Sequence, residues 1–139
     1  MHVGYTFTQG GLFNIPKGWF LVDTYSTCDL SNNPKLVTNI RVCKPEDSLI
    51  AYTNGGAQTY QHIADLLLLP ITVCFKKNSM ATILSFESVS EIPGARITMD
   101  TAVNKSITLT LKDKQVLIFE QYKNVLFFLT QITLNLKMT

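Results

Sequence analysis

Apolar and polar residues alternate along much of this chain, which is typical of β-strands that bury one face and expose the other to water. The alternation is most regular over residues 97–100, 107–111 and 131–139. Threonine fills many of the polar positions, and its branched side chain suits a pleated sheet. These segments therefore predict strands with one dry face.

Turn-forming residues divide the chain at intervals of about 8 to 12 residues, which is the spacing typical of a sandwich or barrel. Breaks of this kind lie at 9–11, 31–34, 44–47 and 112–114. The predicted strands are His2–Thr8, Leu12–Ile15, Trp19–Tyr25, Leu36–Cys43, Ser48–Thr53, Ile71–Lys76, Ala81–Val89, Ile97–Val103, Ile107–Leu111, Val116–Phe119 and Val125–Lys137.

One segment has a different period. Over Ala57–Leu69 the apolar residues recur at helical spacing, and polar residues share the opposite side. Asn54 is a suitable residue to initiate a helix, and Pro70 prevents its continuation. A second helix over 115–130 fits less well, because Leu117 would fall among polar residues. We therefore expect a mainly β, antiparallel sandwich or barrel-like fold with one amphipathic helix at about 57–69.

Composition limits the class of protein. The 139 residues suit a single β-rich domain over 1–139, and 46% hydrophobic residues exclude a disordered chain. A net charge of +2 is too small to indicate a nucleic-acid or anionic-membrane partner. No apolar run approaches the roughly 20 residues that span a bilayer, and no secretory signal is visible. Three cysteines, an odd number, argue against a disulfide framework and favour a reduced state, as in the cytoplasm or a virion.

A glycine pair follows the predicted strand Ser48–Thr53 and precedes the predicted helix. Backbone N–H groups at such a helix start attract anions. The segment lacks the spaced glycines of a dinucleotide fingerprint and the lysine of a nucleotide-binding loop. The candidate ligand-binding residues, for a small anion, nucleotide or sugar, are Asn54, Gly55, Gly56, Gln58, Thr59 and His62.

Catalytic chemistry has little support in the sequence. Cys74 with His62 is the simplest cysteine-nucleophile scheme, but Cys74 lies inside a strand-like run and not at the exposed helix start that activates a thiol. The two histidines and three scattered cysteines have no metal-ligand spacing. We therefore predict no catalytic residues, no metal and no cofactor.

A doubly apolar run near the C-terminus suggests assembly. Such a run belongs in the middle of a sandwich or beneath a partner chain, and here it comprises Val125, Leu126, Phe127, Phe128 and Leu129. The charged fraction of 16% is low, and interface cores are depleted in charge. The leading hypothesis is a self-associating, non-catalytic assembly module, of which viral or phage structural proteins are an example. The alternatives are a small-ligand-binding β protein that sequesters its ligand and, least favoured, a small enzyme with a Cys/His site.

Overall fold

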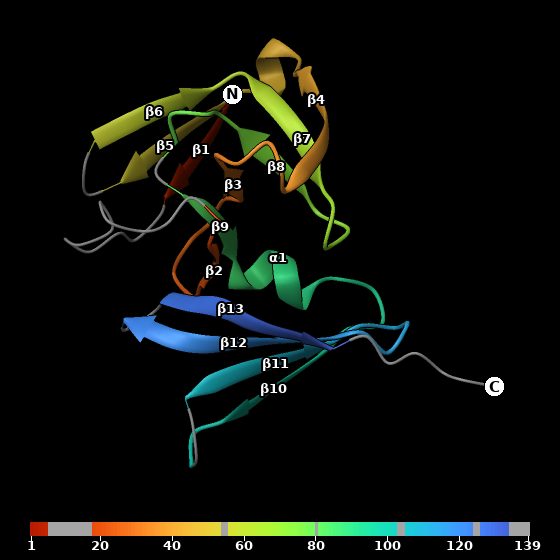
Figure 1. The fold of residues 1–139 in the computed structure, drawn as a ribbon. Coiled ribbons are helices and arrows are strands. Elements are labelled where there is room, and N and C mark those ends of the chain that lie inside the picture. The colour runs from red at the N-terminus through yellow and green to blue at the C-terminus, as the bar shows by residue number, and fades with distance from the viewer. Residues whose placement is uncertain (6–17, 54–55, 80, 103–104, 124–125, 134–139) are drawn as a thin grey trace.

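The backbone is described by a computed structural model over residues 1–5, 18–53, 56–79, 81–102, 105–123 and 126–133 (Figure 1). Within these ranges it forms thirteen strands, one α-helix of five residues and one 3₁₀ turn at Pro45–Asp47. The structure is therefore mostly β, as the alternating pattern predicts. No helix in these ranges is both long and apolar enough to span a bilayer.

The strands form two sheets. The small sheet has the order β1 (His2–Tyr5), β5 (Leu49–Thr53) and β6 (Gly56–Tyr60). The large sheet has the order β10 (Arg96–Asp100), β11 (Ser106–Thr110), β12 (Val116–Lys123), β13 (Leu126–Thr133), β2 (Phe20–Asp23), β9 (Thr82–Ser85), β3 (Leu30–Ser31), β8 (Thr72–Phe75), β7 (His62–Leu66) and β4 (Val37–Val42). Most pairs are antiparallel, but β1–β5, β2–β9 and β3–β8 are parallel.

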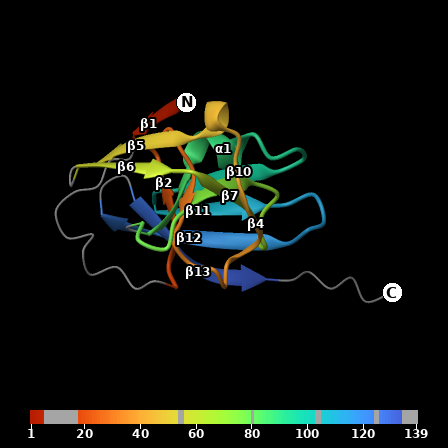
Figure 2. The ribbon, with the colours of Figure 1, turned by 90° about the horizontal axis from the view of Figure 1, so that it is seen from above.

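The large sheet bends around one core and does not close into a barrel. In Figure 1 β4, β7 and β8 lie above β10 to β13, with β2 and β9 between the two halves. Viewed from above, the lower strands lie side by side beneath the upper half (Figure 2). The main core consists of buried side chains from both halves: Phe20, Val22, Val37, Ala64, Leu66, Leu69, Val73, Phe75, Leu84, Val89, Ile92, Ile107, Leu109, Leu117, Phe119 and Phe127. The arrangement is thus sandwich-like.

The small sheet covers the other face of the large one only at β3 and β8. Its inward side chains meet those of β3 and β8 in an interlayer cluster of Cys28, Leu30, Leu49, Ala51 and Tyr60, with Cys74 packed against it. Close approach of the layers leaves no room for a side chain at position 4, because a Cβ on Gly4 would lie 2.7 Å from the Cβ of Cys28. Glycine at this point allows β1 to pack against the cluster.

The predicted helix at about 57–69 is wrong, because this segment forms β6 and β7. Ala57 and Leu67 would lie on its buried face, yet both are exposed. Tyr60 is buried in the interlayer cluster, whereas Ala64 and Leu66 are buried in the main core. The buried residues Tyr60, Ala64 and Leu66 all lie at even positions, as period-two strands require, and the apparent helical spacing comes from the exposed apolar residues Ala57 and Leu67.

The α-helix lies elsewhere, inside the predicted strand Ala81–Val89. Helix α1 (Phe86–Ser90) follows β9 directly and contributes Val89 to the main core. Its start is capped by Ser85, whose hydroxyl oxygen accepts a hydrogen bond from the Ser88 backbone N–H at 3.1 Å. The structure also shows strands over 115–130, so the second helix that the sequence analysis disfavoured is absent from the described part of that segment.

Candidate functional site

A concave site lies where the chain passes from the small sheet to the large one. Strands β6 and β7 are separated only by Gln61, whose carbonyl oxygen accepts a hydrogen bond from the Cys43 N–H at 3.0 Å. Strand β7 then pairs with β8, with His62 opposite Phe75. The corner between β6, β7 and the end of β8 is therefore held by backbone pairing.

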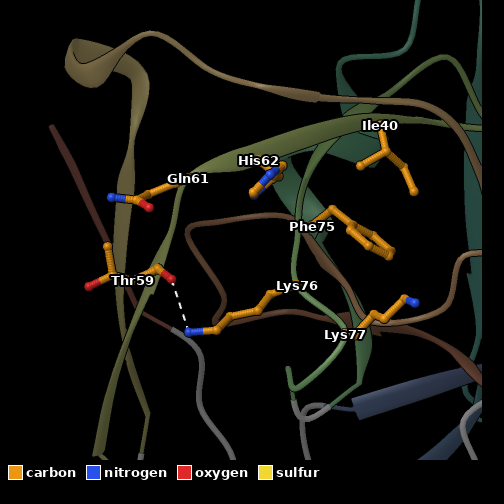
Figure 3. A pocket seen from close by; sticks show the side chains of 7 residues that line it. All are labelled: Ile40, Thr59, Gln61, His62, Phe75, Lys76 and Lys77. Atoms are coloured by element: carbon orange, nitrogen blue, oxygen red, sulfur yellow. Dashed lines mark hydrogen bonds between the residues drawn. The ribbon is translucent and has the colours of Figure 1, made fainter.

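This corner cleft has a volume of about 460 Å³ and is shown in Figure 3. That volume lies in the range of small-molecule sites, roughly 300 to 1,000 Å³. None of its lining residues is acidic, and they are Ile40, Thr59, Gln61, His62, Phe75, Lys76 and Lys77.

One side of the cleft is apolar. Phe75 of β8 is buried in the main core but also lines the cleft, and Ile40 of β4 lies near it (Figure 3). Ile40 is exposed because β4 has an irregular register between Thr38 and Arg41, where Asn39 adopts a φ of 55°. The irregularity re-aims the strand, as bulges commonly do.

The other side carries positive charge at the end of β8. The Lys76 ammonium donates a hydrogen bond to the Thr59 carbonyl oxygen at 3.2 Å and lies 6.0 Å from the centre of the Tyr60 ring. Lys77 is exposed and extends on the other side of the strand end, below Phe75 (Figure 3). Lys76 thus has a fixed position, whereas Lys77 presents its charge to solvent at the cleft.

Next to the cleft, a polar network runs from the buried Tyr60 hydroxyl to the surface at Asn78. The Tyr60 hydroxyl lies 2.6 Å from the Ser79 hydroxyl and donates to the Gln58 side-chain oxygen at 3.1 Å. Gln58 also donates from its amide nitrogen to the Asn78 carbonyl oxygen. Burial raises the pKa of Tyr60 to about 12, so this phenol stays protonated at neutral pH. The network joins the Tyr60 end of β6 to the turn after β8.

The structure assembles part of the predicted ligand-binding set. Thr59 and His62 line the cleft, but Gln58 belongs to the network next to it. Gly56 begins a strand with a φ of 119°, and Asn54 and Gly55 lie outside the described residues. The described residues from Gly56 onward form strand β6 and not a helix, so the helix-start anion site that the sequence predicted is wrong.

The Cys74–His62 scheme does not fit the register. Cys74 is opposite Ile63, and His62 is opposite Phe75, so the two side chains leave opposite faces of the sheet. Cys74 packs against the interlayer cluster, and burial raises the pKa of its thiol to about 11. Among the described residues, no three His, Cys, Asp or Glu side chains group as a metal site would require.

The predicted interface run lies mostly within the protein's own packing. Leu126 and Phe127 are buried, the latter in the main core, whereas Val125 lies outside the described residues. Phe128 stacks on Trp19 with ring centres 4.6 Å apart, and Leu129 packs against the main core. Among the described residues of this run, only Phe128 and Leu129, both partly exposed, retain surface that another chain could contact.

Sequence reasoning missed the other cleft residues. Lys76 and Lys77 form the only adjacent basic pair in the chain, which is a usable signal for an anion site. Ile40 gives no comparable signal, because its place depends on the irregular register of β4. Comparison of the chain with protein families, curated proteins and solved structures yields no match.

Proposed function

We propose that this protein is a non-catalytic binding protein whose corner cleft holds a small organic anion with a flat apolar group. The observation that carries the proposal is the juxtaposition of two lysines with an apolar wall in a cleft with no acidic side chain among its described lining residues. Pockets for small molecules usually combine apolar walls with a few placed polar groups.

Each part of the cleft has a role in this proposal. The flat group of the ligand packs between Phe75 and Ile40, where burial of apolar surface favours binding by about 25 cal/mol per Å². Lys77 attracts the anionic group, and Lys76 adds positive charge from its fixed position on Thr59. His62 and Gln61 supply further hydrogen-bonding groups at the corner.

Titration followed by ¹H–¹⁵N NMR tests the proposal. The probes are naphthalene-2-carboxylate, its neutral analogue naphthalene-2-methanol, and inorganic phosphate. We expect the carboxylate to shift amide resonances of β6, β7 and the end of β8, and to bind more tightly than either partial probe. Lys77→Gln should weaken carboxylate binding about 5- to 10-fold, which corresponds to roughly 1 kcal/mol for one partly solvated charge.

A matched control separates the cleft from general charge effects. Lys112→Gln removes the same charge from an exposed turn between β11 and β12 and should leave binding unchanged. Equal binding by the two lysine variants, or shifts confined to another part of the molecule, would contradict the proposal. Equal affinity for the carboxylate and the neutral alcohol would show that the cleft selects only the apolar group.

A further inference from the structure

The large sheet ends in two edge strands, and these differ in how open they are. Edge strand β4 has an irregular register with its neighbour β7, and the Arg41 guanidinium on β4 forms an ion pair with Asp65 on β7 at 3.3 Å. Edge β10 is regular, with five consecutive pairs to β11 and no other partner among the described strands. A regular edge has a row of backbone donors and acceptors that can pair with another strand.

The core side of β10 is incompletely covered. Ile97 and Met99 are opposite Leu109 and Ile107, two buried residues of the main core, so they share the core-facing side of the sheet. Met99 is nevertheless 49% exposed, because the core-facing side ends with this strand. One more strand beside β10 would cover this apolar surface.

The sequence of β10 is complementary to itself. The strand reads Arg96-Ile97-Thr98-Met99-Asp100. If a second copy pairs antiparallel about Thr98, position 96 is opposite position 100 of the other copy, and Ile97 is opposite Met99. Residues of opposite charge then occupy facing positions at both ends, and apolar residues face each other on the core side.

We propose that two copies of this chain associate through antiparallel pairing of their β10 strands, which joins the two large sheets into one. The charge pattern and the uncovered core side both fit a second copy. Only five residues from each chain pair, so the contact is small and the dimer is expected to be weak and concentration-dependent. This inference does not depend on ligand binding in the corner cleft.

Sedimentation velocity over a protein concentration series from micromolar to about millimolar tests the pairing. We expect a monomer–dimer equilibrium for the unmodified protein. Arg96→Asp places like charges opposite each other at both ends of the pair and should weaken association at least about 10-fold. The swapped variant Arg96→Asp/Asp100→Arg restores facing opposite charges and should restore association to within about 3-fold.

The control Lys44→Asp makes the same net-charge change as Arg96→Asp at an exposed residue that follows the opposite edge strand β4, and should leave association unchanged. An unmodified protein that stays monomeric at the highest concentration overturns the proposal. Association that survives Arg96→Asp, or is not restored by the swap, also overturns it.

A covalent test does not depend on the charged variants. In the proposed dimer, Thr98 of one copy lies opposite Thr98 of the other. Thr98→Cys should therefore form an intermolecular disulfide under mild oxidation. Thr108 lies directly beside Thr98 but on the inner strand β11. Thr108→Cys should therefore form no intermolecular disulfide, and equal cross-linking of the two variants would contradict pairing through β10.

Discussion

At the scale of single residues, the interlayer cluster determines the chemistry of two cysteines. Burial raises the pKa of the Cys28 thiol to about 12 and that of Cys74 to about 11. Only the thiolate is nucleophilic, and at pH 8 a thiol with a pKa of 11 is ionised in about one molecule in a thousand. Both thiols therefore serve as small apolar side chains, consistent with their packing.

We expect Cys28 and Cys74 to resist alkylation. In a Cys43→Ser variant, labelling with iodoacetamide at pH 8, followed by intact-mass spectrometry, should be at least about 100-fold slower than labelling of glutathione. The half-buried Cys43 should account for the first label on the unmodified protein. Rapid double labelling of Cys43→Ser would show that the layers open readily.

At the scale of elements, the sequence predicts where strands lie better than it predicts which strands pair with each other. Strands such as Ile107–Leu111 are found because one face is dry and the other wet over their whole length. Helix α1 is too short, at five residues, for its period to be distinct from that of β9 before it. The segment 57–69 misleads because neighbouring strands, not local preference, supply its backbone hydrogen bonds.

The candidate site shows the same limit. Thr59 and His62 were predicted as ligand residues, but the predicted reason, a helix start, is wrong. Pairing of His62 with Phe75 places them beside Lys76 and Lys77, and a single sequence does not reveal such long-range register. Asn-Gly at 54–55 follows an apolar run and is a strong hairpin signal, and the strands on either side of it, β5 and β6, pair antiparallel.

The start of helix α1 gives a pH prediction. The Asp29 carboxylate accepts hydrogen bonds from the Ser85 N–H at 2.8 Å and the Ser88 hydroxyl at 2.6 Å. Burial nevertheless raises the pKa of Asp29, and these hydrogen bonds offset the rise only in part. The folded state therefore binds a proton more tightly than the unfolded state, and its stability falls as pH rises from the ordinary Asp pKa to the raised value.

Asp29→Asn removes the titrating carboxyl group and with it this dependence of folding stability on pH. Urea unfolding at several pH values between 3 and 7 should show the unmodified protein losing stability relative to Asp29→Asn as pH increases. The exposed control Glu46→Gln should not reproduce that difference. A difference of opposite sign would mean that hydrogen bonds to the carboxylate outweigh its burial.

At the scale of the whole molecule, one sheet and one core join the two halves. The main core draws side chains from β4, β7 and β8 as well as from β11, β12 and β13. The small sheet is attached through the interlayer cluster. Unfolding of any layer should expose the others, which is the physical content of the single-domain prediction.

Fluorescence of the single tryptophan tests this cooperativity from a distant position. Trp19 contacts Tyr122 and Phe128 on β12 and β13, whereas Gly4 packs against Cys28 under the small sheet. Gly4→Ala should destabilise the protein by about 1–3 kcal/mol through overpacking. In urea, it should shift the fluorescence and circular-dichroism transitions equally.

The control Val3→Thr changes an exposed side chain on the same strand and should leave both transitions nearly unchanged. Gly4→Ala could shift part of the circular-dichroism transition to lower urea while the fluorescence midpoint stays fixed. That result would mean that the small sheet unfolds separately and that its packing does not stabilise the β2–β13 region. Trp19 packs against a third cluster, formed by Leu21, Ala81 and Ile83. Coincident shifts therefore require that the interlayer cluster and the cluster at Trp19 unfold together, so that the 2.7 Å clash at Gly4 affects Trp19 fluorescence.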